Sequence, residues 1–168
     1  NFTEPFQLLP SPEKINFDYT YSSIQPHDLK LAFSKNGDSL PILYGLLKTL
    51  KQTSKDKNAK IHFNIDPKIN ETPENYQLQI SEKKITIKAK DKAGLFYAFV
   101  TLNQLINDAL QLKLPLPKLT VNDSPEINFR SIHVDVKHHR EKESYYYQLI
   151  DKVILNLFYN YQVFFRII

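Results

Sequence analysis

The amino-acid sequence predicts an α+β fold, in which an antiparallel sheet carries helices on one face, and it predicts that a second domain opens near the C-terminal end. Short segments in which apolar and polar residues alternate predict strands, because successive side chains of a strand point to opposite faces. Two longer segments with apolar residues at every third or fourth position predict helices. The stretch 122–128, which contains Pro125 and precedes a new strand-like segment, predicts the domain boundary.

The composition of the chain is that of a globular protein. Its 168 residues suffice for one ordinary domain, and 42% hydrophobic against 24% charged residues provide material for a core. No apolar run reaches the ~18 residues that a membrane span needs. The net charge of +4 is spread over lysines separated by acidic residues, so nucleic-acid binding is not expected. The absence of Cys excludes disulfides and thiolate metal sites.

The N-terminal third is expected to form an arm or edge hairpin, one strand and one helix. Segment 6–10 is a short apolar run closed by turn residues, and segment 14–19 alternates like a half-buried strand. Asp38 or Ser39 can cap a helix that has Pro41 in its first turn. The apolar stripe of this helix would pack on the sheet and consists of Ile42, Leu43, Leu46, Leu47 and Leu50.

Three further strands are predicted over 60–65, 76–80 and 84–88. The last two alternate clearly, and the short polar connection between them suits an antiparallel hairpin. His62 falls on the polar face of its strand, which predicts a surface histidine rather than a metal ligand.

The strongest helical pattern follows Asp91, and a last short strand is predicted over 119–121. This helix should be the main cover of the sheet, while Phe96 and Tyr97 fall partly off its stripe and could meet a neighbouring domain. The stripe consists of Leu95, Ala98, Phe99, Leu102, Leu105, Ile106 and Ala109.

Four stretches, in this order, resemble the β-N-acetylhexosaminidases of glycoside hydrolase family 20. They read ENYQLQI at 74–80, ITIKA at 85–89, AGLFYAFVTLNQL at 93–105, and NDSP at 122–125 followed by FRSIHVD at 129–135. The resemblance covers about two thirds of the chain. Ser131 and the aromatic segment 157–168 depart from the family pattern.

The resemblance implies two parts. Residues 1–125 look like the noncatalytic N-terminal domain of the family, and residues 126–168 look like the start of its catalytic (β/α)8 barrel. Within that start, 129–136, 144–158 and 161–168 would form the first βαβ portion of the barrel. A complete barrel needs about 250 residues, so this one is expected to be truncated.

The resemblance also implies an activity for a longer parent chain. Such a glycoside hydrolase removes terminal N-acetylhexosamine by substrate-assisted catalysis, in which the acetamido group of the substrate attacks the anomeric carbon. An adjacent Asp-Glu pair performs this chemistry in the family, and no adjacent Asp-Glu pair occurs here. The chain is therefore expected to contain no catalytic residue and to be inactive by itself.

Three residues match site positions of the family. Arg130 matches an arginine that binds sugar hydroxyls, and Asp135 and His139 match residues at the end of the first barrel strand that shape the site. The histidines near this strand lack the carboxylate spacing of a metal site, so no metal and no cofactor are expected.

The remaining expectations concern partners and location. The parent would bind carbohydrate through the missing barrel, and the apolar barrel remnant would be exposed and could cause self-association. A bacterial protein that is secreted or periplasmic, with outer-membrane association left open, is expected. The alternative is a stand-alone α/β binding or scaffold module without catalysis, whose C-terminal segment would complete the sheet of the first domain.

Overall fold

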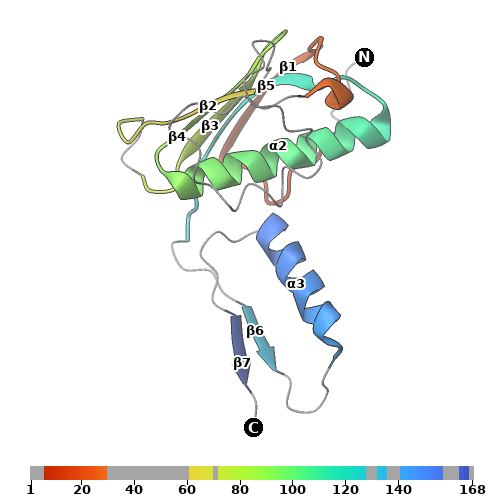
Figure 1. Cartoon of the computed structure of the whole chain (residues 1–168). Helices are drawn as coiled ribbons and strands as arrows, with labels where there is room; N and C mark the ends of the chain where they lie inside the picture. Colours follow the sequence, from red (N-terminus) through yellow and green to blue (C-terminus); the bar gives the residue numbers. More distant parts are fainter. Residues whose placement is uncertain are drawn as a thin grey trace. The chain divides into compact units, whose positions relative to one another are not determined.

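The computed structural model describes residues 6–29, 61–69, 72–127, 132–135, 141–156 and 163–166. The chain divides into two compact units, Asn1–Ser124 (unit 1) and Pro125–Ile168 (unit 2). Unit 1 contains the sheet and the long helix, and unit 2 contains two short strands and one helix (Figure 1). Within the described segments, no helix is both long enough and apolar enough to cross a membrane.

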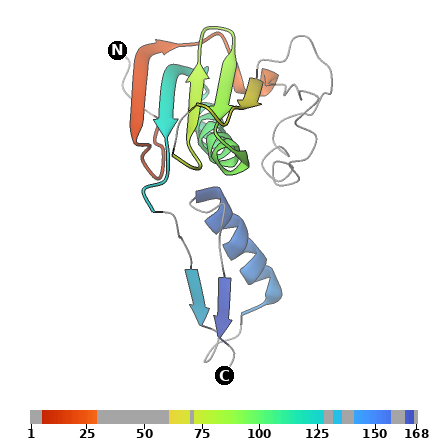
Figure 2. The same cartoon turned by 90° about the vertical axis from the view of Figure 1, so that its left-hand side faces the viewer.

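Unit 1 has the α+β architecture that the sequence predicts. Its mixed sheet has five strands in the order β1-β5-β3-β4-β2 (Figure 2). All five predicted strands are confirmed, although β5 is longer than the predicted 119–121. The bounds are Lys14–Tyr21 for β1, Ile61–Ile65 for β2, Tyr76–Ile80 for β3, Ile85–Ala89 for β4 and Pro117–Asp123 for β5.

The sheet is not antiparallel throughout, so that part of the prediction is wrong. β2 pairs with β4 in parallel, with Ile61 opposite Ile85, whereas β3 and β4 form the predicted antiparallel hairpin. The physical reason is that a period of two fixes which face a side chain occupies but carries no information on strand direction. His62 on β2 is exposed, as predicted.

The helix α2 (Lys92–Leu112) covers one face of the sheet and contacts β2, β3 and β4 (Figure 1). The carboxylate of Asp91 caps its N-terminus by accepting a 2.8 Å hydrogen bond from the Gly94 N–H. Its C-terminus ends at Lys113, which is left-handed at φ 57°, and the Leu114 N–H returns to the Ala109 carbonyl. The predicted helix that begins at Asp38 or Ser39 lies outside the described residues.

The core of unit 1 lies between α2 and the sheet. Alternate residues of β3 and β4, from Tyr76 to Ala89, are at most 2% exposed and point toward the helix. On α2 the whole predicted stripe is buried, and Phe96 is buried as well while Tyr97 is half-buried. The buried surface of α2 is thus wider than the apolar stripe that the sequence predicts.

Segment 6–10 is an arm that lies along α2. Phe6 and Leu8 are buried. The side-chain amide of Gln104 makes two hydrogen bonds with the backbone of Leu9. Its Oε1 accepts from the Leu9 N–H at 2.9 Å, and its Nε2 donates to the Leu9 carbonyl at 2.8 Å. Of the two predicted forms, the arm is therefore the one observed.

Unit 2 has a strand-helix-strand order, β6 (Ile132–Asp135), α3 (Glu143–Asn156) and β7 (Val163–Arg166). β6 and β7 are parallel, as a βαβ connection requires. Among the described strands, these two form a sheet of their own and do not join the five-stranded sheet. The feature expected of a stand-alone module, a C-terminal segment that completes the first sheet, is therefore not seen in this part of the chain.

Candidate functional site

The predicted site residues lie in or near unit 2. Arg130 and His139 lie outside the described residues. Asp135 is the last residue of β6, and its backbone is in register with that of Arg166, the last residue of β7. Asp135 is thus placed at the carboxyl end of a parallel strand pair. In the described part of the chain, no group of three or more His, Asp or Glu could hold a metal ion.

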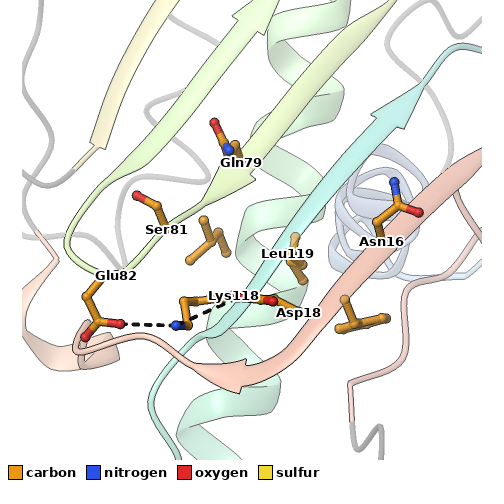
Figure 3. A pocket seen from close by; sticks show the side chains of 9 residues that line it. Asn16, Asp18, Gln79, Ser81, Glu82, Lys118 and Leu119 are labelled. Carbon is orange, nitrogen blue, oxygen red and sulfur yellow. Dashed lines mark ion pairs between the residues drawn. The ribbon is translucent and has the colours of Figure 1, made fainter.

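A shallow hollow of about 400 Å³ lies on unit 1, bordered by β1, β5, β3 and the β3–β4 turn (Figure 3). Ile80 and Leu119, whose side chains are almost fully buried, also border it. Asn16, Gln79 and Lys118 belong to the sheet face that points away from α2, because their neighbours along each strand are the more buried residues. The hollow is lined by Asn16, Phe17, Asp18, Gln79, Ile80, Ser81, Glu82, Lys118 and Leu119.

The wall of the hollow on β1 is a bulge that inserts two extra residues. Phe17 lies opposite Leu119 and Tyr21 opposite Pro117, so that the backbone of residues 18–20 lies opposite Lys118 alone. Tyr19 in the bulge is left-handed at φ 52°, a conformation that residues other than Gly rarely adopt. The Thr20 hydroxyl donates to Asp18 Oδ2 at 3.4 Å. The bulge therefore turns the Asp18 carboxylate toward the lysine of the next strand.

The charges of the hollow are two carboxylates that share one ammonium group. Lys118 Nζ lies 3.8 Å from Asp18 Oδ2 and 3.4 Å from Glu82 Oε2 (Figure 3). The side chains of Asp18 and Glu82 are 70% and 57% exposed, and that of Lys118 is 25% exposed. Exposed pairs of this kind contribute at most about 1 kcal/mol each. The cluster carries one net negative charge.

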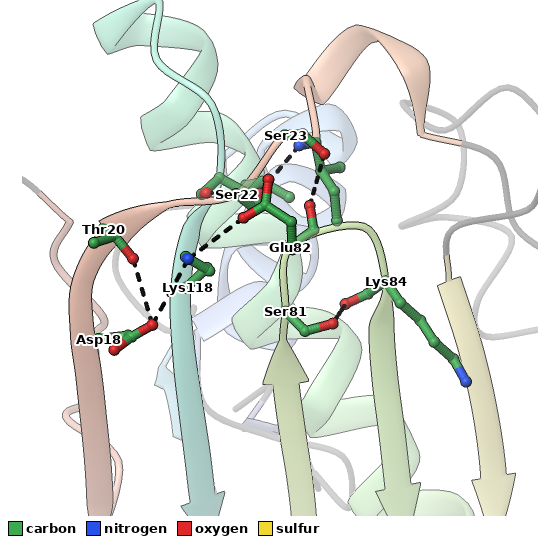
Figure 4. A network of polar contacts seen from close by, with 10 residues as sticks. Asp18, Thr20, Ser22, Ser23, Ser81, Glu82, Lys84 and Lys118 are labelled. Atoms are coloured by element: carbon green, nitrogen blue, oxygen red, sulfur yellow. Dashed lines mark hydrogen bonds and ion pairs between the residues drawn. The ribbon is translucent and has the colours of Figure 1, made fainter.

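Hydrogen bonds of serines hold the rim of the hollow (Figure 4). The Glu82 carbonyl accepts from the Ser23 hydroxyl at 2.7 Å and from the Ser23 N–H at 2.9 Å. The Ser81 hydroxyl donates to the Lys84 carbonyl at 2.9 Å and closes the β3–β4 turn. The Ser22 hydroxyl donates to the Leu116 carbonyl at 2.8 Å. The turn that carries Glu82 is thus fixed to the segment that comes after β1.

The hollow is suited to binding rather than to acid–base catalysis. A general acid of a glycosidase needs a carboxyl group that is desolvated, whereas Asp18 and Glu82 are mostly exposed. Amide, hydroxyl, carboxylate and ammonium groups together can donate and accept hydrogen bonds over a small area. Sequence reasoning missed this hollow because its residues come from three distant segments.

A second polar cluster is buried near the exit of β5. The Tyr76 hydroxyl donates to Asp123 Oδ2 at 3.2 Å and lies 2.7 Å from Thr101 Oγ1, so the threonine hydroxyl must be the donor in that pair. Burial, and then the charge of Asp123, raise the pKa of Tyr76 well above its usual range. The Asn75 amide donates to the Asp123 carbonyl at 3.1 Å. The cluster ties β3 and β5 to α2, which is a structural role.

Comparison with known proteins agrees with this architecture. The family model described as Glycosyl hydrolase family 20, domain 2, matches residues 6–124. Beta-hexosaminidase B of Pseudoalteromonas piscicida is 28% identical over 120 residues, which are 70% of this chain and 15% of that protein. Beta-N-acetylhexosaminidase of Cellulomonas fimi is 38% identical over 66 residues, 39% of this chain and 13% of that protein. The chain therefore spans less than a sixth of each of these relatives.

Solved structures share the fold. The exo β-N-acetylglucosaminidase of Vibrio harveyi, from glycoside hydrolase family 20, superposes with a TM-score of 0.74 at 22% identity, over 96% of this chain and 26% of that chain. The β-N-acetylhexosaminidase of Streptomyces coelicolor A3(2) gives 0.73 at 19% identity, over 96% of this chain and 35% of that chain.

Proposed function

Since the chain belongs to glycosyl hydrolase family 20, and its unit 1 to domain 2 of that family, we propose that it is the N-terminal part of a β-N-acetylhexosaminidase. The longer protein that contains it removes terminal N-acetylhexosamine from saccharides. The observation that carries this proposal is the family match over residues 6–124, which covers nearly all of unit 1. Unit 1 itself is the noncatalytic domain of that enzyme.

Unit 2, in this proposal, is the start of the catalytic barrel. A (β/α)8 barrel begins with a strand, a helix and a second strand parallel to the first. The order β6, α3, β7 and the parallel pairing of the two strands have this form. Arg130 then binds sugar hydroxyls through its guanidinium fork, and Asp135 and His139 shape the site at the strand end.

Substrate-assisted catalysis needs groups that the sequence of this chain does not contain. The acetamido oxygen of the substrate attacks the anomeric carbon, an aspartate orients the acetamido group, and a neighbouring glutamic acid protonates the leaving oxygen. No adjacent Asp-Glu pair occurs in the 168 residues. The chain by itself therefore lacks hydrolase activity. The longer protein binds a carbohydrate substrate.

The location follows from the substrate. Polymers of N-acetylhexosamine lie outside the bacterial cytoplasm, and the relatives named above are bacterial hexosaminidases. The longer protein is accordingly secreted or periplasmic.

The test is hydrolysis of 4-nitrophenyl N-acetyl-β-D-glucosaminide by two proteins, the 168-residue chain and the product of its complete gene. The expected result is turnover by the complete product and none above buffer by the chain. A complete product that folds but releases no 4-nitrophenol would overturn the hexosaminidase proposal. Turnover by the chain alone would overturn the proposal that catalysis resides in the rest of the longer protein.

The role of Arg130 is tested by Arg130→Lys in the product of the complete gene. This substitution keeps the positive charge and removes the planar guanidinium group, which can donate two hydrogen bonds at once. Losing a hydrogen bond of a charged group lowers kcat/KM between about tenfold and a hundredfold. Lys142→Arg, at an exposed position just before α3, is the matched control and leaves kcat/KM unchanged. An unchanged kcat/KM for Arg130→Lys would remove Arg130 from the sugar site.

A further inference from the structure

The sheet face of unit 1 that points away from α2 is polar throughout its two central rows. Strand pairing aligns one residue from each of the five strands in every row. One row consists of Asn16, Thr120, Gln79, Thr86 and His62, and the next consists of Lys14, Asn122, Gln77, Lys88 and Asn64. Five of these ten side chains are carboxamides, each of which both donates and accepts hydrogen bonds.

This chemistry argues against a protein as the main occupant of the face. The fully buried centre of a stable protein interface is apolar and depleted in charge, and neither row contains an apolar side chain. A ligand that carries many hydroxyl and amide groups fits better, since each of its groups finds both donors and acceptors.

The hollow supplies the concave part of this face. Its two carboxylates are able to accept hydrogen bonds from the hydroxyl groups of a ligand, and the Lys118 ammonium group between them is able to donate hydrogen bonds to such hydroxyl groups. Asn16 and Gln79, one from each side of β5, reach it from the first row. Charged and amide groups from three strands thus converge on one small volume.

The bulge in β1 is an independent observation at the same place. Tyr19 follows Asp18, is 63% exposed, and occupies a left-handed conformation without being Gly. Unfavourable backbone conformations of this kind persist where the surrounding structure enforces them and are concentrated at functional sites.

We propose that the hollow and the adjoining first row form a saccharide-binding site of unit 1, which takes a β-linked oligosaccharide of N-acetylhexosamine. The identity of the sugar rests on the proposed function, whereas the site itself rests on the side chains of unit 1. The carboxamides of Asn16 and Gln79 bind the hydroxyl and acetamido groups, and Asp18, Glu82 and Lys118 bind hydroxyl groups at the concave end.

The test is a titration of the isotopically labelled 168-residue chain with triacetylchitotriose, monitored by amide chemical shifts. A shallow open site predicts a Kd on the order of 1 mM. The expected shifts are confined to residues 16–18, 79–82 and 118–120. Cellotriose, which has the same linkage but no acetamido groups, is expected to bind at least about tenfold more weakly, since lost hydrogen bonds of this kind are worth about that factor.

The chain offers a matched pair of variants. Gln79→Ala removes a carboxamide that lines the hollow, and Gln77→Ala removes the same group from the same strand and the same face, outside the hollow. The expected result is a Kd raised about tenfold by Gln79→Ala and less than about twofold by Gln77→Ala. Spectra of the free variants show whether each retains the fold.

Three outcomes would overturn the proposal. They are no shifts up to about 10 mM trisaccharide, tenfold above the expected Kd, equal effects of the two variants, and equal binding of cellotriose. Binding by the chain does not require hydrolysis, so this result is read separately from the activity of the complete gene product. An inactive complete product together with saccharide binding would refute the proposed enzyme and leave the site standing.

Discussion

Tyr76 joins three elements of unit 1 through its hydroxyl group. The side chain is 1% exposed on β3, and its hydroxyl lies between Thr101 on α2 and Asp123 at the end of β5. Burial next to the Asp123 carboxylate disfavours the phenolate and raises the pKa of Tyr76. A tyrosine whose pKa is higher in the folded than in the unfolded state makes stability depend on pH.

Tyr76→Phe tests this linkage. Below pH ~10 the phenol is protonated in both states, and above it the unfolded chain loses a proton that the folded chain keeps. The free energy of unfolding of the wild type is therefore expected to fall by up to about 1.4 kcal/mol more per pH unit than that of the variant between pH 10 and 12. At neutral pH the variant loses about 1 to 2 kcal/mol, because Asp123 and Thr101 lose a partner. Urea unfolding at several pH values measures both effects.

Thr101→Val provides the control for the hydrogen bonds. In the double variant with Tyr76→Phe, the loss is expected to be smaller than the sum of the single losses by about 0.5 kcal/mol or more, because the two hydroxyls bind each other. Equal alkaline slopes for wild type and Tyr76→Phe would contradict the account of the raised pKa.

At the scale of elements, hydrogen bonds hold the N-terminus of α2 next to the residues that precede β3. The two oxygens of the Asp91 carboxylate accept from the Gly94 N–H and, at 2.9 Å, from the Glu74 N–H. The Lys90 N–H donates to the Asn75 carbonyl at 2.9 Å. A Cβ on Gly94 would collide with the Asn75 carbonyl oxygen and lie 2.8 Å from that of Glu74. These two oxygens belong to the backbone of a segment that is hydrogen-bonded to residues 90 and 91, so moving them away from an added Cβ would cost free energy.

Gly94→Ala is expected to destabilise unit 1 although alanine is the better helix former. Replacing Gly inside a helix usually gains up to about 1 kcal/mol, but the collision costs about 1 to 3 kcal/mol and reverses the sign. Thermal unfolding measures the change. Asn107→Ala, at an exposed position of the same helix, is the control and should gain some tenths of a kcal/mol. A Gly94→Ala variant as stable as the wild type would show that the junction is looser than described.

The elements of unit 1 could be predicted from the sequence, whereas their pairing could be predicted only in part. Alternation in β3 and β4 identifies both the strands and their buried faces, and the short turn between them identifies an antiparallel hairpin. The direction of β2 depends on where its connection leads, which no local pattern records. The bulge of β1 was not predictable either, because its left-handed residue is Tyr19 and not Gly. The hollow depends on that bulge and on strand order, so it appears only in three dimensions.

At the scale of the molecule, unit 1 has what an independent domain needs. Five strands and α2 enclose its core, the buried apolar residues of β3, β4 and α2 lie within it, and the family match ends at its last residue. A protein that ends at Ser124 is expected to unfold in one cooperative transition, as small domains do. Circular dichroism gives the transition, and amide spectra compared with those of the full chain give the fold. Loss of the transition would show that unit 1 depends on residues 125–168 for its stability.

The pairing of β1 with β5 places the first and the last strand of unit 1 side by side. Lys14, the first residue of β1, lies opposite Asn122, and the Glu13 N–H donates to Asp123 Oδ1 at 3.0 Å. The polypeptide therefore enters and leaves the sheet at the same point. A domain with adjacent ends can be spliced into another protein, or circularly permuted, with only a short joint. The segment from β1 to β5, residues 14–123, meets this geometric requirement for insertion into a loop of another protein.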